Sequence, residues 1–114
     1  MTQHASLTVQ RWLQFSLEQR ILMIGNEMNR TMKRVADPAP EPRRLGYERV
    51  LRLTDLTVEA GVRPGLRREL LRWRGLVAAL YVTEAADVDA HRAAFRALLQ
   101  LHPAAATQIP VLLA

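Results

Sequence analysis

Two stretches of the chain repeat one four–three spacing, and this spacing constrains the fold more than any other feature of the sequence. The first row comprises Leu17, Ile21, Ile24, Met28, Thr31 and Val35. The second row comprises Leu66, Leu70, Trp73, Val77, Leu80 and Glu84. Side chains at this spacing line one side of an α-helix, so each row, which we call a seam, predicts a helix that packs on another helix. Each seam is shorter than three heptads, which favours a compact bundle over a long coiled coil.

Local signals mark both ends of the first long helix. Ser16 and Gln19 have the spacing of a capping box, so we expect a helix over about Leu17 to Ala36. Three alternating prolines follow it, and each removes an amide donor and biases the preceding residue to extended geometry. Residues 37–43 are therefore predicted to form a stiff, exposed, Pro-rich connector.

Similar signals delimit the remaining helices. Gly61 is typical of a helix C-cap and predicts the end of a helix that covers about Arg44 to Ala60. The second seam predicts a helix over about Leu66 to Val82. Asp87 is a good N-cap for a fourth helix, which should end before Pro103.

The two chain ends complete the predicted architecture. Residues 1–6 are expected to be a loose N-terminus, and residues 7–15 have a short helical pattern. Residues 103–114 form an apolar C-terminal tail that we expect to pack on the bundle or on a neighbouring subunit. The prediction is one all-α domain over residues 1–114, an up-and-down bundle of four helices with a short extra N-terminal helix.

Composition removes several function classes. The chain has no cysteine, which excludes a disulfide, a thiolate metal site and a cysteine nucleophile. Residues 1–10 have neither the basic start nor the apolar run of a secretory signal. No apolar run approaches the roughly 18 residues that span a bilayer. We therefore expect a cytoplasmic protein with no membrane partner.

The histidines and carboxylates do not predict a catalytic or metal centre. His91 and His102 are eleven residues apart, which is about 16 Å along a helix and too far for one metal ion. The carboxylates of residues 44–60 alternate with arginines, a pattern typical of a solvated helix face. We expect no metal and no cofactor.

Arg96 and His102 match a looser pattern. An arginine followed by four to six residues and a histidine resembles the signature of HEPN-type RNases, which are small helical bundles. That resemblance implies an RNA-cleaving cleft between two subunits, with Arg96 and His102 as catalytic residues. The chain departs from the family pattern at Ala97, where a polar residue usually follows the arginine.

A basic strip is the other candidate for nucleic-acid contact. The chain has a net charge of +5, and much of the excess lies on the predicted helix over residues 66–82 and the turn before it. Its arginines are Arg63, Arg67, Arg68, Arg72 and Arg74. They straddle an apolar seam, which favours ion pairs with Asp55, Glu59 or Glu84 over phosphate contacts.

Three blocks in order carry a wider resemblance: SLEQRILMIGNEMNR at residues 16–30, YERVLRLTDLT at 47–57 and RRELLRWR at 67–74. They resemble blocks in a group of small bacterial helical proteins with no assigned activity. The resemblance covers roughly residues 16–82 and implies a bacterial, all-α protein. Within the blocks, polar residues beside apolar seams predict a register-fixing network, formed by Asn26, Asn29, Arg30 and Asp55.

The seams assign most apolar residues to a core, so few side chains remain for chemistry. We therefore predict a non-enzymatic interaction protein that packs on itself, as a homo-oligomer, or on a protein partner. The predicted interface residues are Trp12, Phe15, Leu45, Leu56, Ile109, Val111, Leu112 and Leu113. The alternative is a nucleic-acid-associated, HEPN-like module that binds or cleaves RNA.

Overall fold

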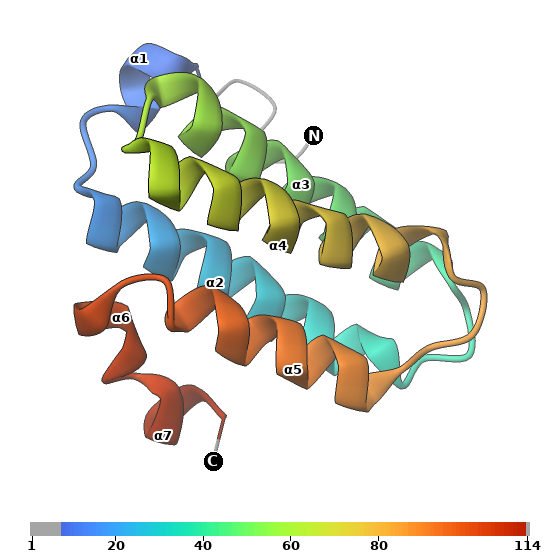
Figure 1. The fold of residues 1–114 in the computed structure, drawn as a ribbon. Helices are drawn as coiled ribbons and strands as arrows, with labels where there is room; N and C mark the ends of the chain where they lie inside the picture. The colour runs from blue at the N-terminus through green and yellow to red at the C-terminus, as the bar shows by residue number, and fades with distance from the viewer. Residues whose placement is uncertain (1–7, 114) are drawn as a thin grey trace.

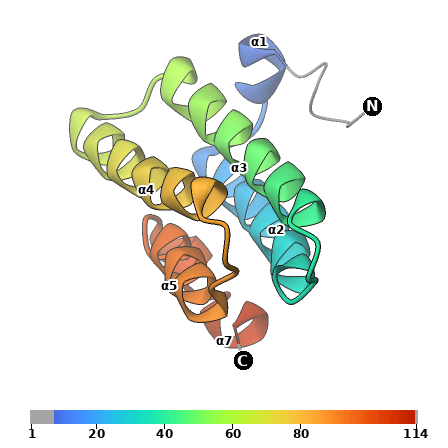
Figure 2. The same cartoon turned by 90° about the vertical axis from the view of Figure 1, so that its right-hand side faces the viewer.

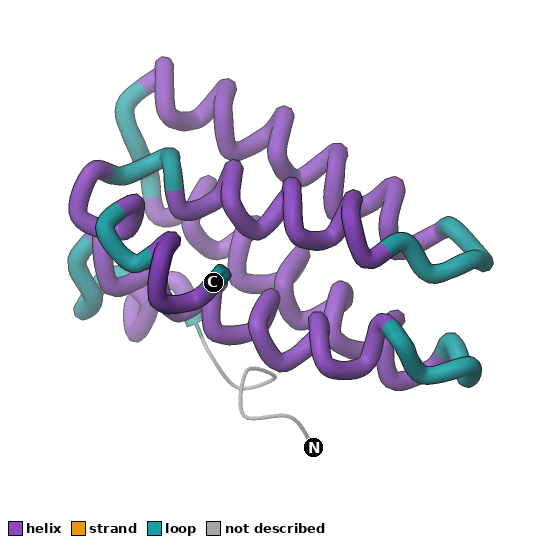
Figure 3. The backbone as a smooth tube through the Cα atoms, turned by 90° about the horizontal axis from the view of Figure 1, so that it is seen from below, coloured by secondary structure: helices purple, strands orange, loops and turns teal. Residues whose placement is uncertain are grey.

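The computed structural model describes residues 8–113, which form seven α-helices and no strand (Figures 1 and 3). The helices are α1 (Val9–Trp12), α2 (Leu17–Val35), α3 (Glu41–Ala60), α4 (Pro64–Val82), α5 (Val88–Leu99), α6 (Pro103–Ala106) and α7 (Ile109–Leu112). The four main helices, α2 to α5, run alternately up and down. The predicted all-α bundle with a short N-terminal helix is confirmed. The expectation for residues 1–6 lies outside the described residues.

The start of α2 has the predicted capping box. The Ser16 hydroxyl accepts a hydrogen bond from the Gln19 amide at 3.1 Å, and the Gln19 side chain accepts from the Ser16 amide at 2.8 Å. Two amides that the first turn leaves without helical partners are thereby satisfied. Glu18 places a negative charge at the positive end of the helix dipole.

The Pro-rich connector is shorter than predicted. Helix α3 begins at Glu41, so the connector covers residues 37–40, and its predicted extent over residues 37–43 is wrong. Pro42 occupies the first turn of α3, where amides have no helical acceptor and proline carries no penalty. At the other end, Gly61 has a φ of 92° and caps α3 as predicted.

The start of α4 differs from the predicted one because of a proline, and the start of α5 is capped by the predicted aspartate. Helix α4 begins at Pro64, two residues before the predicted Leu66, because proline suits the first helical position. Asp87 accepts from the Ala90 amide at 2.9 Å and is the predicted N-cap of α5.

The two seams are the inner faces of the bundle. The buried members on α2 are Ile21, Ile24, Met28, Thr31 and Val35. The buried members on α4 are Leu66, Leu70, Trp73 and Val77, whereas Leu80 is half-buried and Glu84 is exposed. Figure 2 shows α2, α3, α4 and α5 at four corners, with each helix beside two others.

Both ends of the described chain fold onto the bundle. Helix α1 packs on α3, and the Trp12 indole donates to the Thr57 hydroxyl at 2.9 Å. At the other end α6 contacts α2 and α5, which buries Ala105 completely. Arg92 donates to the Leu113 carbonyl at 3.0 Å. The C-terminal tail therefore packs on its own bundle.

Candidate functional site

A hollow lies between α4 and α5, where two neighbouring helices leave space between them. Its volume is about 420 Å³, and apolar atoms make up most of its lining. Helix α4 and the residue after it contribute Leu76, Ala79, Leu80 and Thr83. Helix α5 and its N-cap contribute Asp87, Ala90, Ala93 and Ala94. The volume is within the range of sites that bind small molecules or side chains of a partner.

A second hollow continues the first along the same helix pair. It has a volume of about 280 Å³, and Leu76 lines both hollows. Its other lining residues are Glu69, Arg72, Trp73, Ala97, Gln100 and Leu101. We call the two hollows together the α4–α5 groove. The groove follows the whole length of α5, since its lining residues extend from Asp87 to Leu101.

Small side chains on α5 create this groove. One side of α5 carries His91, Phe95, Leu98 and Leu99, which are all buried in the core. The neighbouring side carries alanines at 90, 93, 94 and 97, at the three and four spacing of one helix face. Ala94 contacts α4, since its carbonyl accepts a hydrogen bond from the Trp73 indole at 2.7 Å, but the short side chains of this row leave space between the helices. This alanine spacing is visible in the sequence, but the interface prediction considered only large apolar residues.

The two ends of the groove carry opposite charge. The exposed acids Glu84, Asp87 and Asp89 lie at the end where α5 begins. The exposed arginines Arg68, Arg72 and Arg96 lie towards the other end, in the first half of α4 and the last turn of α5, and Arg72 lines the groove itself. Glu69 partly offsets this basic end, because its carboxylate is 3.5 Å from the Arg72 guanidinium.

A buried arginine holds the acidic end of the groove in place. Arg43 on α3 is 3% exposed, and its guanidinium donates to the carbonyls of Thr83 at 3.2 Å and Glu84 at 2.7 Å. These carbonyls follow the last turn of α4, where a positive charge is favourable to the helix dipole. The loop between α4 and α5 is therefore anchored to α3.

A histidine at the centre of the bundle joins three helices. The ring of His91 is fully buried, and its Nε2 is 2.9 Å from the Met28 carbonyl. Since a carbonyl only accepts, Nε2 carries the proton, and Nδ1 accepts from the Tyr47 hydroxyl at 2.8 Å. Burial lowers the pKa of His91 and raises the pKa of Tyr47 to about 12.

The predicted register-fixing network does not form. Arg30 pairs with Glu27 at 2.8 Å, Asp55 pairs with Arg74, and Asn26 is exposed. The buried hydrogen bonds of His91 and Tyr47 instead link α2, α3 and α5. The sequence signal for this arrangement was weak, because a tyrosine and a histidine 44 residues apart carry no spacing rule.

Three of the predicted interface residues are wrong, because they belong to the core of this chain. Trp12 is 0%, Leu56 2% and Leu113 5% exposed, so almost none of their surface is accessible to a partner. Trp12 and Leu113 lie in end segments that fold back onto the bundle. Leu56 lies on a second side of α3, which other parts of the chain cover.

The remaining predicted interface residues are half-buried or exposed. Phe15 is half-buried, with its ring 5.8 Å from that of Trp12. Ile109 and Leu112 are half-buried against the core, whereas Leu45 and Val111 are exposed. None of them lines the α4–α5 groove.

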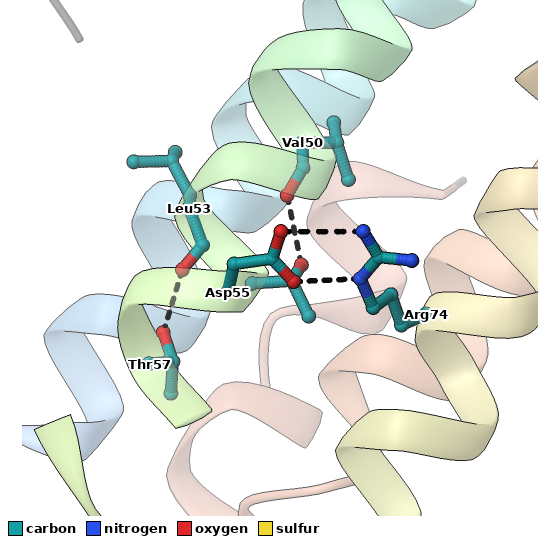
Figure 4. Close-up of polar contacts among 6 residues, drawn as sticks. Val50, Leu53, Asp55, Thr57 and Arg74 are labelled. Carbon is teal, nitrogen blue, oxygen red and sulfur yellow. Dashed lines mark hydrogen bonds and ion pairs between the residues drawn. The ribbon is translucent and has the colours of Figure 1, made fainter. Parts of the chain in front are cut away.

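The arginines of the predicted basic strip divide between two roles. Arg63, Arg67, Arg68 and Arg72 are all exposed at the surface. Arg74 instead donates to both carboxylate oxygens of Asp55, at 2.6 and 3.2 Å, which Figure 4 shows as a pair between α4 and α3. The hydrogen bond to Asp55 raises the pKa of Arg74. The predicted pairing with Asp55 is therefore confirmed for one arginine.

The two HEPN-like residues lie near the C-terminal end of α5. Arg96 is exposed, and His102 is half-buried at the start of α6. The Nδ1 atom of His102 accepts from the Ala104 amide at 3.1 Å and caps that short helix. The structure therefore gives His102 a local structural contact of its own.

Two further findings concern the part of the chain that the structure describes. It contains no group of three histidine, aspartate or glutamate side chains able to hold a metal ion. Within the same residues, no helix has both the length and the apolar content that crossing a membrane requires.

In comparisons with known proteins, no family model, curated sequence or solved structure matches this chain significantly. The α4–α5 groove is therefore the feature from which a function can be proposed.

Proposed function

We propose that this chain is a non-enzymatic interaction protein of a bacterial cytoplasm, and that a helix of a protein partner binds in its α4–α5 groove. The observation that carries the proposal is the 420 Å³ apolar hollow between two main helices of the bundle. Grooves of this kind receive the apolar face of an amphipathic helix, which enters with side chains at three and four spacing.

Exposed apolar side chains around the groove support the same function. Leu76 is 50% exposed within it, and Val82 and Val88 are 70% and 44% exposed beside its acidic end. Burial of such side chains against a partner contributes roughly 25 cal/mol for each Å² removed from water. Leu76 lines the groove, so a partner helix that binds there would cover it.

The engagement of the buried titratable groups supports a binding role over catalysis. Both ring nitrogens of His91 are hydrogen-bonded inside the core, and the Arg43 guanidinium holds the α4–α5 loop. A general acid or base must reach a substrate proton. These groups instead fix the helices that frame the groove.

Site-specific photo-crosslinking in the native cell tests the proposal. A photoreactive residue at position 93, in the groove, should form a protein adduct, whereas the same residue at position 26, exposed on α2, should not. The adduct should disappear in a Leu76→Asp background, because a carboxylate in the groove opposes apolar docking. Adducts at exposed position 45 in place of position 93 would move the binding surface to α3 and overturn the proposal.

The HEPN-like function is the alternative proposal. The exposed Arg67, Arg68, Arg72 and Arg96 favour it, since exposed arginines contact phosphates. The capping role of His102 weighs against it, because the Nδ1 atom is already engaged. RNA binding that weakens steeply with salt, with cleavage lost in Arg96→Ala, would support this alternative. No shift of RNA in a gel at low salt would end it.

A further inference from the structure

We infer that the partner at the α4–α5 groove is a second copy of this chain, docked about a two-fold axis that passes between the two copies of α5 near Ala93. The inference rests on the proposed function and names its partner. Charge and shape along α5 carry it.

The charge along α5 reverses about its middle. Asp89 is exposed in the first turn and Arg96 in the last, and they are seven positions apart, which is about 10 Å along the helix. Ala93 lies between them and lines the groove. The face that carries Asp89, Ala93 and Arg96 is therefore negative at one end, apolar in the middle and positive at the other end, whereas Arg92 is half-buried and donates to the Leu113 carbonyl.

Because the charge reverses along α5, two copies related by a two-fold axis have complementary charges. In an isologous dimer every contact occurs twice. If one residue of the first copy contacts another residue of the second copy, the same two residues also meet with the copies exchanged. Antiparallel packing of α5 on α5 about Ala93 places Asp89 of each copy opposite Arg96 of the other. A parallel arrangement would bring like charges together. The charge pattern thus specifies both the partner and its direction.

Charged residues in and beside the groove agree with this direction. Glu84 and Asp87 lie at the same end as Asp89, and Arg68 and Arg72 lie towards the same end as Arg96, where Glu69 offsets part of the positive charge. A two-fold rotation brings the acidic end of one copy towards the basic end of the other. Complementary potentials of this kind select a partner and suppress the wrong register.

The shape of the groove suits close approach of two helices. Ala90, Ala93 and Ala97 follow the three and four spacing along the groove side of α5, so its backbone can approach a neighbouring helix closely. Leu76 lies beside this row and is half exposed. In the dimer each Leu76 side chain is buried against the alanine row of the other copy.

Light scattering during size-exclusion chromatography tests the dimer. The full chain should have twice the 12.9 kDa mass of one copy at micromolar concentration. Arg96→Glu and Asp89→Arg should each weaken the dimer about tenfold or more, because each places two pairs of like charges across the axis. An equimolar mixture of these two variants should recover the dimer. In the mixed dimer the introduced glutamate faces the introduced arginine, and the native Arg96 faces the native Asp89.

Matched controls separate this effect from altered helix stability. Asp89 and Arg96 lie in the first and last turns of α5, where charge reversal opposes the helix dipole. Glu18→Arg and Lys33→Glu make the same kind of reversal in the first and last turns of α2, outside the groove. These controls should keep the wild-type dimer.

The outcomes distinguish the inference from the proposed function. A strict monomer at about 100 μM, or two monomeric variants that do not recover the dimer when mixed, would overturn the inference. A position-93 adduct of one chain with a different protein would also overturn it while supporting the proposed function. An adduct of twice the chain mass supports both, and the absence of any groove adduct removes both.

Discussion

The α2–α3 and α4–α5 sides of the bundle use small residues in opposite ways. On α3, Gly46 faces Thr31 of α2 so closely that a β-carbon at position 46 would overlap the threonine side chain. On α4, Gly75 is exposed and lies outside the groove lining, and it has no neighbouring atom within 4 Å of the place of a β-carbon. Small residues close the first interface by letting two backbones meet. On the second side, the short side chains of Ala90, Ala93 and Ala97 leave the groove open.

This contrast separates the part of the bundle that supplies stability from the part available for binding. The α2–α3 side holds buried Met28, Thr31 and Tyr47, whereas the α4–α5 side retains a solvent-open apolar hollow. Apolar surface that a fold leaves uncovered marks a place where a partner binds. If this division holds, substitutions on the two sides should have different effects.

The largest expected difference in stability comes from truncating one large side chain in the core, Phe95 of α5, and one in the groove, Leu76 of α4. Phe95 is fully buried, so Phe95→Ala should lower the free energy of unfolding by about 3–5 kcal/mol. Leu76 lines the groove and is half exposed, so Leu76→Ala should cost under about 1 kcal/mol. Urea denaturation at one low protein concentration measures both. Equal losses would mean that the groove is part of the core.

Alanine at the two glycines should change stability in opposite directions. Gly46→Ala forces α2 and α3 apart at Thr31 and should cost about 1–3 kcal/mol. Gly75→Ala meets no atom and should raise stability by about 0.5–1 kcal/mol, because glycine disfavours a helix interior. Chemical denaturation of both variants provides the measurement. A stabilised Gly46→Ala protein would contradict the close contact of α2 and α3.

The buried histidine predicts a loss of stability in mild acid. Because burial lowers the pKa of His91, the unfolded chain takes up a proton at this residue before the folded chain does. Stability should therefore fall as the pH drops through about 6.5, the usual histidine pKa, by up to about 1.4 kcal/mol for each pH unit until the folded protein is protonated.

His91→Gln isolates this contribution, since glutamine does not titrate. The difference in unfolding free energy between wild type and His91→Gln should narrow between about pH 7.5 and pH 5. His102→Gln is the matched control and lies outside the core. A difference that stays constant or widens on acidification would show that His91 is not held neutral by the core.

Periodicity predicted the helices because it depends only on neighbours along one chain. The seam of α2, the Ser16 capping box and the Asp87 cap all follow local rules, and the structure has each of them. The start of α3 was misplaced by three residues because proline both breaks helices and begins them. Which role applies depends on the residues that surround it in space.

The groove could not be predicted in the same way, since it depends on the distance between two helices. Ala93 is a good helix former in the sequence, and only the position of α4 makes it part of a cavity. The prediction for Trp12 erred in the opposite direction, because an interface residue was predicted where the structure has a core residue. It lies near one end of the sequence, yet it is buried in the core and its indole donates to Thr57. Both the groove at Ala93 and the burial of Trp12 depend on contacts between segments that are distant in the sequence.

The smallest expected effect concerns the ion pair that joins α3 to α4. Asp55 and Arg74 are 40% and 38% exposed in their side chains, so solvent screens their attraction. Asp55→Asn should cost about 0.2–1 kcal/mol in denaturant unfolding, and the cost should shrink in about 1 M salt. Glu48→Gln, which alters the contact with Tyr81 between the same two helices, is the control.

A loss above about 2 kcal/mol for Asp55→Asn would exceed what a half-exposed pair contributes and would mean that this pair sets the position of α4. The groove would then depend on a charge at the surface. The burial of Leu66, Leu70, Trp73 and Val77 predicts instead that the apolar seam holds α4 in place.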